Sequence, residues 1–327
     1  AKKIGSKFAL ATSSCTGALH LGLESLNIKK GDEVIVPEST WVASVAPIVH
    51  LGAKPVFVDI LKDSWCIDPK LVESAITPKT RAILCVHLYG NLCEISELLK
   101  LSKKYNLPLI EDSAEAFGSK YFSKYVGSFG SFGVFSFHGS KTISTGEGGM
   151  LVTNDKKIFE KVKTLNNHGI KRNTDQQYCP TELGYKFKIT NIQAAMGLAQ
   201  IERSEEIIQK KIKIMQFYKD YFYNNKCISF NIEHHGCRNS FWMPTAIFSS
   251  CCKINIPSLI NEFQVESIDA RSFFCPLSSL KFFKENIMNK ISRDIYNRAI
   301  NLPSFFDMSE NQLIKICKII EKNISKK

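Results

Sequence analysis

Short apolar runs rich in β-branched and aromatic residues recur along the first half of the chain, and segments with the helical spacing of apolar positions lie between them. The runs predict buried strands at residues 32–37, 55–59, 82–87, 109–112, 134–137 and 150–152. The intervening segments predict helices at residues 42–51, 68–76, 93–105 and 155–165. Strands that alternate with helices indicate an α/β fold with a mostly parallel, doubly wound sheet and helices on both faces.

A longer segment with helical periodicity, residues 192–223, predicts one long helix in the second half of the chain. We interpret this helix as a hinge, because shorter strand and helix patterns follow it. The 327 residues are enough to form two domains. The sequence therefore predicts a large domain at residues 1–205 and a smaller C-terminal α/β domain at residues 206–327.

The composition is that of an ordinary globular protein, with 44% hydrophobic and 23% charged residues. We expect neither a membrane span nor a signal peptide, because no apolar stretch approaches about 18 residues and the start of the chain is polar and basic. The eleven cysteines are scattered without a CxxC pair, which predicts reduced thiols, a cytoplasmic protein and no metal site.

The formal net charge is +12, but the lysines are spread along the chain, with a modest concentration at Lys210, Lys211 and Lys213. A nucleic-acid-binding protein would concentrate its basic residues in a patch or a known module. We therefore expect a solvated basic surface and no binding of nucleic acid. A positive field would also favour a polyanionic small ligand, such as a nucleotide diphosphate.

One lysine, Lys141, lies between the strands predicted at residues 134–137 and 150–152. The segment after it, residues 145–149, is too rich in glycine for a helix and suits a tight loop that another group approaches closely. Lysine is normally a surface residue, so Lys141 could be an ordinary loop residue. Alternatively, it is a desolvated amine that attacks a carbonyl group and forms a Schiff base.

A carboxylate, Asp112, ends the strand predicted at residues 109–112. An Asp at a strand end can be a helix cap, but a carboxylate paired with a lysine also meets the needs of pyridoxal phosphate. The lysine holds the aldehyde, and the carboxylate keeps the pyridine nitrogen protonated. Hydroxyl side chains at residues 12–16 precede an apolar helical period, which predicts a helix N-terminus whose free N–H groups can bind an anion.

The segments 13–20, 111–115 and 136–149 together resemble the sugar-nucleotide aminotransferases of the DegT/DnrJ/EryC1/StrS family. The similarity extends from about Phe8 to the C-terminal helix. It implies a pyridoxal-phosphate (PLP) enzyme with the aspartate-aminotransferase fold, PLP fold type I. Family members usually carry a few tens of residues before the phosphate-binding helix, so we expect this sequence to be either truncated or reduced at the lip of its site.

The resemblance implies a role for each matching residue. Lys141 would hold the PLP aldehyde and move protons, and Asp112 would pair with the pyridinium nitrogen. The other cofactor contacts would be Thr16, Gly17 and Ser136 at the phosphate, Trp41 stacked on the ring, and Glu115 near the ring hydroxyl. Without the resemblance, Trp41 would be interpreted as a core anchor.

The resemblance also implies a homodimer with shared active sites. The loop before the long helix would reach the site of the partner subunit, where Lys186 would contact the phosphate in place of the asparagine common in the family. Tyr185, His138 and Arg271 would bind the substrate. His138 could equally be a satisfied core histidine, and Arg271 could equally form an exposed surface pair.

Lys141 also bears on the reaction, because family members that dehydrate the sugar carry histidine in its place. The motifs resemble enzymes that transfer an amino group, expected from glutamate, to C4 of a nucleotide-linked 4-keto-6-deoxyhexose. The products would be perosamine- or viosamine-type sugars, and no motif distinguishes GDP, UDP and dTDP. Two alternatives remain. One is amination at C3 or of another ketone, as in aminohydroxybenzoate synthesis, and the other is a non-catalytic binding or regulatory protein.

Overall fold

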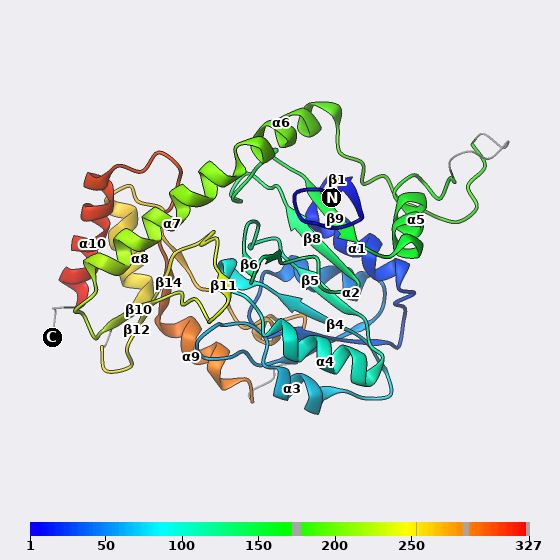
Figure 1. The fold of residues 1–327 in the computed structure, drawn as a ribbon. Helices are drawn as coiled ribbons and strands as arrows, with labels where there is room; N and C mark the ends of the chain where they lie inside the picture. Colours follow the sequence, from blue (N-terminus) through cyan, green and yellow to red (C-terminus); the bar gives the residue numbers. More distant parts are fainter. Residues whose placement is uncertain (172–177, 253, 284–287, 325–327) are drawn as a thin grey trace.

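A seven-stranded sheet is the centre of the larger part of the computed structural model, which describes residues 1–171, 178–252, 254–283 and 288–324 (Figure 1). Its strands are β1 (Phe8–Thr12), β2 (Glu33–Pro37), β3 (Lys54–Val58), β4 (Thr80–Val86), β5 (Leu109–Asp112), β8 (Phe132–Ser136) and β9 (Gly149–Thr153). The order across the sheet is β1-β9-β8-β5-β4-β2-β3. All neighbours from β8 to β3 are parallel, whereas β9 runs antiparallel to β8 and β1. The predicted α/β fold with a mostly parallel sheet is confirmed.

Helices cover both faces of this sheet, as predicted. The helices on one face are α1 (Cys15–Ser25), α2 (Ala46–His50) and α5 (Lys156–Leu165), and those on the other are α3 (Pro69–Ala75) and α4 (Ile95–Tyr105). In β2, Val34 and Val36 pack on the α1 side and Ile35 packs on the α4 side. Successive side chains of a strand point to opposite faces, so a strand covered on both sides is apolar throughout.

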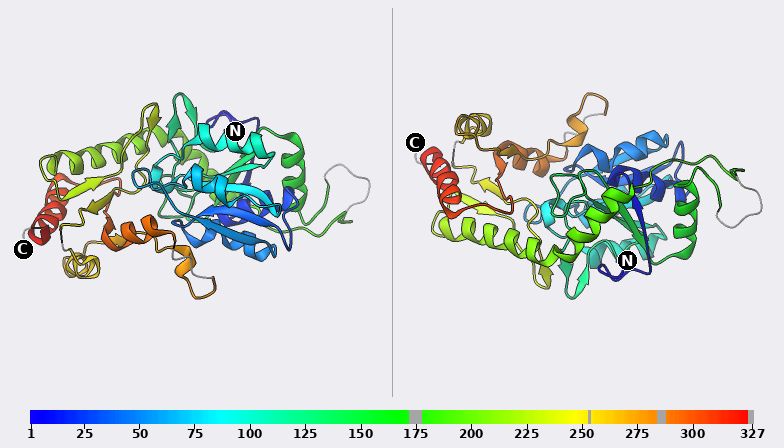
Figure 2. Two further views of the ribbon diagram at one scale, coloured as in Figure 1. Left: turned by 90° about the horizontal axis from the view of Figure 1, so that it is seen from below. Right: turned by 90° about the horizontal axis from the view of Figure 1, so that it is seen from above.

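A second, four-stranded antiparallel sheet lies at one end of the molecule, beside the large sheet (Figure 2). Its order is β10-β12-β14-β13, and it packs with α7 (Ser204–Tyr221), α8 and α10 around a core of its own. We call α7 and the described residues after it the second unit. The elements are β10 (Ile228–Phe230), β12 (Thr245–Phe248), β13 (Arg271–Ser272), β14 (Ala299–Asn301), α8 (Ile256–Val265), α9 (Lys290–Arg298) and α10 (Glu310–Ile324).

Several short elements complete the described chain. A small sheet joins β6 (Lys120–Tyr121), β7 (Lys124–Tyr125) and β11 (Cys237–Arg238), and the 3-10 turns are η1 (Val42–Ser44), η2 (Leu88–Gly90) and η3 (Leu277–Ser279). The helix predicted at residues 42–51 is therefore divided into η1 and α2. Every helix of the described residues is too short or too polar to cross a lipid bilayer.

The prediction of one helix at residues 192–223 is wrong, because the structure divides it into α6 (Asn191–Glu202) and α7 (Ser204–Tyr221). The break is at Arg203, next to a buried Ser204 whose hydroxyl donates to the Ile201 carbonyl at 2.7 Å. Such side-chain bonds compete with the helical backbone pattern. The two helices also differ in environment, since α7 buries six side chains and α6 buries none.

Two buried carboxylates hold the chain after β13 against the large sheet. Glu38, just after β2, accepts from the Ser278 N–H at 2.8 Å and also from the Asn289 side-chain amide. Asp59, just after β3, accepts from the N–H groups of Ile291 at 2.8 Å and Ser292 at 3.0 Å, in the first turn of α9. A carboxylate is stabilised by the free N–H groups of a helix N-terminus. These bonds fix part of the second unit above the ends of the parallel strands.

Gly149, at the start of β9, lets the backbone at the start of α1 come close. A Cβ atom at this position would lie 2.4 Å from the Cys15 nitrogen and 2.4 Å from the Ser14 carbonyl carbon. Only glycine permits this approach without a shift of the backbone. The close contact places the N-terminus of α1 beside the loop that carries Lys141.

We predict that Gly149→Ala lowers the free energy of unfolding by about 1–3 kcal/mol, the usual cost of overpacking. The matched control is Gly139→Ala in the loop before β9, where a Cβ atom would meet only one atom within 4 Å, at 3.8 Å. Its effect should stay within about 0.5 kcal/mol. Chemical denaturation of both variants tests the prediction. Equal stability of the two variants would show that the approach of α1 is not tight.

Candidate active site

A cavity of about 1030 Å³ lies where the large sheet meets the second unit. The carboxyl ends of β4, β5 and β8, the start of α1 and the segment around β13 line it. Ligands of open parallel sheets bind at this edge of the sheet. Of the predicted site residues, it brings together Thr16, Trp41, Asp112, Glu115, Ser136, His138, Lys141 and Arg271.

Lys141 lies on the wall of this cavity with 14% of its side chain exposed. Its Nζ atom is 3.4 Å from Glu115 Oε1 and 3.7 Å from the centre of the Trp242 ring. A carboxylate and an aromatic face both stabilise the ammonium form of a lysine. The amine is therefore held by one charged and one π contact, and it is not an ordinary loop lysine.

Trp242 reaches Lys141 from the second unit and is itself held in place. Its indole N–H donates to the Ser140 carbonyl at 2.7 Å, and its own carbonyl accepts from Lys211 Nζ at 3.3 Å. Burial lowers the pKa of Lys211 to about 8. Sequence reasoning missed the role of Trp242, because its contact with Lys141 joins distant parts of the chain.

Asp112 ends β5 with its carboxylate buried in the cavity wall. Oδ2 accepts from the Ser44 hydroxyl at 2.7 Å, and Oδ1 accepts from the Ala114 N–H at 3.0 Å. The Thr40 and Ser44 hydroxyls are 2.9 Å apart and extend this chain of hydrogen bonds. Burial raises the pKa of Asp112, although these donors and Lys141 oppose the rise. Ser44 was missed in the sequence, where it is only one hydroxyl within an apolar segment.

Glu115 is the second buried carboxylate of the site. Its Oε2 accepts from the Tyr89 N–H at 3.0 Å, while Oε1 faces Lys141. Burial raises the pKa of Glu115, and the positive charge of Lys141 opposes this. Tyr89 adopts a positive φ of 54°, which costs a non-glycine residue about 1 kcal/mol or more. This strained backbone aims the Tyr89 N–H at Glu115.

The start of α1 lies at the cavity, where its N–H groups can bind an anion. Ser14 caps the helix by accepting from the Gly17 N–H at 3.0 Å, and Ser14, Cys15 and Thr16 line the cavity. Gly17 does not line it and lies against the Phe187 ring, where a Cβ atom would come within 3.1 Å. The unpaired N–H groups and dipole of a helix start attract phosphate. Ser136, at the end of β8, adds a hydroxyl on the same cavity.

Three predicted side chains lie at the open part of the cavity. Trp41 is 58% exposed, so the alternative of a core anchor is wrong. His138 is also exposed, with Nδ1 at 2.9 Å from the Ser140 hydroxyl, so it is not a core histidine. Arg271 forms the predicted exposed pair with Asp269 at 2.6 Å and also lines the cavity, and its binding of substrate stays a prediction.

Like Gly17, the predicted residues Tyr185 and Lys186 do not line the cavity of their own chain. Tyr185 packs edge-on to His20, with ring centres 4.9 Å apart, and stacks on Phe187 at 5.1 Å. Lys186 is exposed beside it. A contact of Lys186 with the site of a partner subunit, and a contact of Tyr185 with substrate, stay predictions.

The residues around the cavity fit PLP. The start of α1 and Ser136 can hold a phosphate, Trp41 can cover an aromatic ring, Asp112 can pair with a ring nitrogen, and Lys141 can bond to an aldehyde. Asp112 and Lys141 both line the cavity, and Glu115, not Asp112, is the carboxylate that contacts the lysine. The cofactor would supply an electron sink that no protein side chain offers.

The sequence profile of the DegT/DnrJ/EryC1/StrS aminotransferase family matches residues 1–321. The chain is 40% identical over 322 residues to the GDP-perosamine synthase of Escherichia coli O157:H7, covering 98% of this chain and 87% of that protein. It is 37% identical over 318 residues to the GDP-perosamine synthase of Vibrio cholerae, covering 96% and 86% of the two chains.

Solved structures of aminotransferases also resemble this chain. An aminotransferase from Psychrobacter cryohalolentis superposes with a TM-score of 0.91 at 27% identity, covering 98% of this chain and 88% of that one. The PLP-form of Spr1654 from Streptococcus pneumoniae also superposes with a TM-score of 0.91 at 27% identity, covering 99% and 88%. These similarities confirm the predicted aspartate-aminotransferase-like fold and the predicted cofactor.

The buried carboxylate of Asp112 gives a prediction for the cofactor-free protein. A raised pKa in the folded state means that the protonated carboxyl stabilises the fold at low pH, and that this stability is lost as the pH rises through the folded-state pKa. Asp112→Asn mimics the protonated form. We expect the variant to be more stable than wild type at neutral pH, by on the order of 1 kcal/mol, and equally stable in acid.

Chemical unfolding across this pH range measures the difference. Asp63→Asn is the control, because Asp63 is exposed and its amide analogue can keep the bond from the Ser64 N–H. A stability difference between Asp112→Asn and wild type that does not change with pH would contradict the account.

Proposed function

The chain belongs to the DegT/DnrJ/EryC1/StrS aminotransferase family, and from this premise we propose that it transfers an amino group from glutamate to C4 of a nucleotide-linked 4-keto-6-deoxyhexose. It is a PLP-dependent sugar aminotransferase. One observation carries the proposal: Lys141 Nζ lies 3.4 Å from a buried Glu115, in the same cavity as Asp112 and the start of α1. This arrangement suits amine chemistry on a bound carbonyl.

Lys141 is the group that would attach the cofactor and afterwards carry protons. PLP, when bound, supplies an electron sink for the bonds at the reacting carbon. The Lys141 amine lies on the cavity wall, where it can take a proton from one side of the substrate and return it to another atom. Glu115 and the Trp242 ring keep the amine within reach after it is released.

Asp112 and Glu115 hold charge at two places in the cavity. The Asp112 carboxylate, oriented by Ser44 and the Ala114 N–H, would hold a proton on the ring nitrogen. Glu115 faces the amine and would stabilise the ammonium form of Lys141 after it accepts a proton. Asp112 would thereby favour a proton on the ring nitrogen, and Glu115 would favour a proton on the Lys141 amine.

We take the sugar to be GDP-linked and the product to be of the perosamine type, because two relatives at 40% and 37% identity are named GDP-perosamine synthase. The cavity of about 1030 Å³ has room for a nucleotide sugar beside the cofactor. Arg271, at its exposed part, is a candidate ligand of the diphosphate. A nucleotide sugar as substrate also favours the cytoplasm as the site of action.

Another ketone remains the main competing substrate. Solved structures of similar fold include 3-amino-5-hydroxybenzoic acid synthase, at 26% identity and a TM-score of 0.91. The product in that name is not a sugar. The family therefore accommodates several ketones on one scaffold. The carbon of a defined ketosugar that receives the amino group distinguishes C4 from C3 amination, because the two products differ in their NMR spectra.

We also infer a homodimer from the surface of α6. None of its residues is buried in the single chain, and even the apolar Ile192 and Leu198 are 77% and 62% exposed. Leu183, in the loop before it, is 93% exposed. Met196, one helical turn from Ile192, is 47% exposed, and such neighbouring exposed apolar side chains mark protein interfaces. The exposed Lys186 in the same loop would then reach the site of the partner subunit.

We also propose that each chain divides into two domains, residues 1–205 and 206–327.

We predict that the PLP-loaded protein with glutamate aminates GDP-linked 4-keto-6-deoxymannose at C4 and releases 2-oxoglutarate. Lys141→Ala should lower kcat by about a thousandfold, because a positioned acid–base group is lost. The control Lys103→Ala removes an exposed lysine and should retain activity. Product NMR and 2-oxoglutarate release give the measurement. Amination at C3 would correct the substrate, and full activity of Lys141→Ala would refute the mechanism.

We predict that Ile192→Asp together with Leu198→Asp converts a dimer into a monomer, because charges replace apolar contacts at the interface. Val265→Asp is the matched control, since Val265 is 75% exposed on α8, away from α6. Sedimentation velocity of the three proteins measures the change. A monomeric wild type, or dissociation in the control as well, would contradict the assignment of α6.

A further inference from the structure

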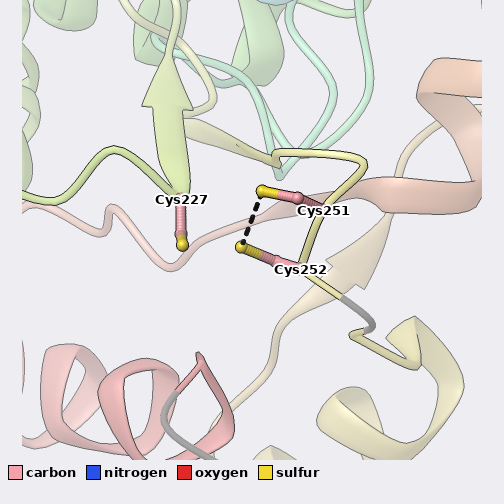
Figure 3. A group of neighbouring side chains, drawn as sticks. All are labelled: Cys227, Cys251 and Cys252. Carbon is pink, nitrogen blue, oxygen red and sulfur yellow. Dashed lines mark hydrogen bonds between the residues drawn. The ribbon is translucent and has the colours of Figure 1, made fainter. Parts of the chain in front are cut away.

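Three thiols from two separate places in the sequence meet in the second unit (Figure 3). Cys227 precedes β10, and Cys251 and Cys252 lie in the turn between β12 and α8. Their sulfur atoms all lie within 4.8 Å of one another, and those of Cys251 and Cys252 are 4.0 Å apart. Among the residues that the structure describes, they are the one group of three or more His, Cys, Asp or Glu side chains close enough to hold a metal ion.

The backbone determines this convergence. β10 and β12 pair antiparallel with Ile228 opposite Phe248, and the pairing continues as the Ser249 N–H donates to the Cys227 carbonyl at 2.8 Å. The Cys252 N–H then donates to the Ser249 carbonyl at 2.9 Å and closes the turn. The two strands therefore present Cys227 beside the turn before any ligand arrives, which is the preorganisation that a binding site needs.

We propose that Cys227, Cys251 and Cys252 form a binding site for a soft, thiophilic metal cation of the zinc or copper(I) class. Tetrahedral zinc with bonds of about 2.3 Å to sulfur separates its ligand sulfurs by about 3.8 Å, and a flat three-coordinate ion of the same bond length separates them by about 4.0 Å. The 4.0 Å between the Cys251 and Cys252 sulfurs fits either geometry, and the other sulfur pairs, within 4.8 Å, need to approach by less than about 1 Å. Sulfur ligands select these ions over hard cations such as Mg²⁺.

The surroundings of the thiols also suit a bound ion. Cys252 is buried, Cys227 is half-buried and Cys251 is exposed, so the cluster is supported on one side and open to solvent on the other. The Ser249 hydroxyl lies 3.1 Å from the Cys251 sulfur and can orient that ligand. A solvent molecule on the open side could complete a tetrahedral zinc site.

This site is separate from the catalytic cavity, since none of the three cysteines lines it. The turn leads into α8, which begins at Ile256 and contributes Ile260 and Gln264 to the cavity wall. An ion that joins β10 to this turn would stabilise the second unit and the start of α8. Because it would bind the folded chain preferentially, it should raise the unfolding temperature.

Anaerobic titration of the reduced, PLP-loaded full chain tests the site, with Zn²⁺ and Cu⁺ in separate arms, Mg²⁺ as a hard-cation control and a chelator as competitor. We expect one Zn²⁺ or Cu⁺ per chain, no response to Mg²⁺ and a higher unfolding temperature. Cys227→Ser and Cys252→Ser should each weaken binding by more than about tenfold. Cys179→Ser, which removes an exposed cysteine elsewhere, should bind as wild type does.

Cys251→Ser keeps the test valid if the buried variants unfold, because this exposed side chain contributes little packing. It should also weaken binding by more than about tenfold. Binding in only one of the two arms would support the site and identify the ion. Binding that survives all three substitutions, or that falls equally in Cys179→Ser, would overturn the proposal, as would the absence of tight binding in both arms.

Discussion

The site depends on the burial of two carboxylates, Asp112 and Glu115, next to a single lysine. Burial of each carboxylate is unfavourable and raises its pKa, so each needs donors to remain useful as an anion. The fold supplies them from separate places: Ser44 and the Ala114 N–H for Asp112, and the Tyr89 N–H and Lys141 for Glu115. The parallel sheet brings these groups together at the carboxyl ends of its strands.

The active site also needs both parts of the chain. Trp242 belongs to the second unit but covers Lys141, in the loop between β8 and β9 of the large sheet, and Lys211 and Ser140 hold it there. Glu38 accepts from the Ser278 N–H, and Asp59 accepts from N–H groups in the first turn of α9, so both also bind the second unit to the large sheet. A relative movement of the two units would therefore act directly on the reactive amine. This coupling gives a physical reason for an aminotransferase built from two packed sheets.

Sequence reasoning recovered what local patterns encode. The parallel strands and most of the helices around them follow from periodicity, and Asp112 and Lys141 stand out because charged residues end or interrupt buried runs. Ser44 and Trp242 could not be found this way, since their contacts join distant segments. The break at Arg203 was missed because α6 and α7 share one helical period and differ only in what covers them. The thiol cluster was missed for the same reason as Trp242, because only the pairing of β10 with β12 joins its members.

The central claim is that Lys141, and no other lysine, bonds to the cofactor beside Asp112 and Glu115. Borohydride reduction of the PLP-loaded protein, followed by peptide mass spectrometry, tests it most directly, because reduction makes the bond between cofactor and lysine permanent. The account predicts one modified lysine per chain, Lys141, and no modified peptide in Lys141→Ala. Modification at another lysine, or a loaded protein that yields no modified peptide, would contradict it.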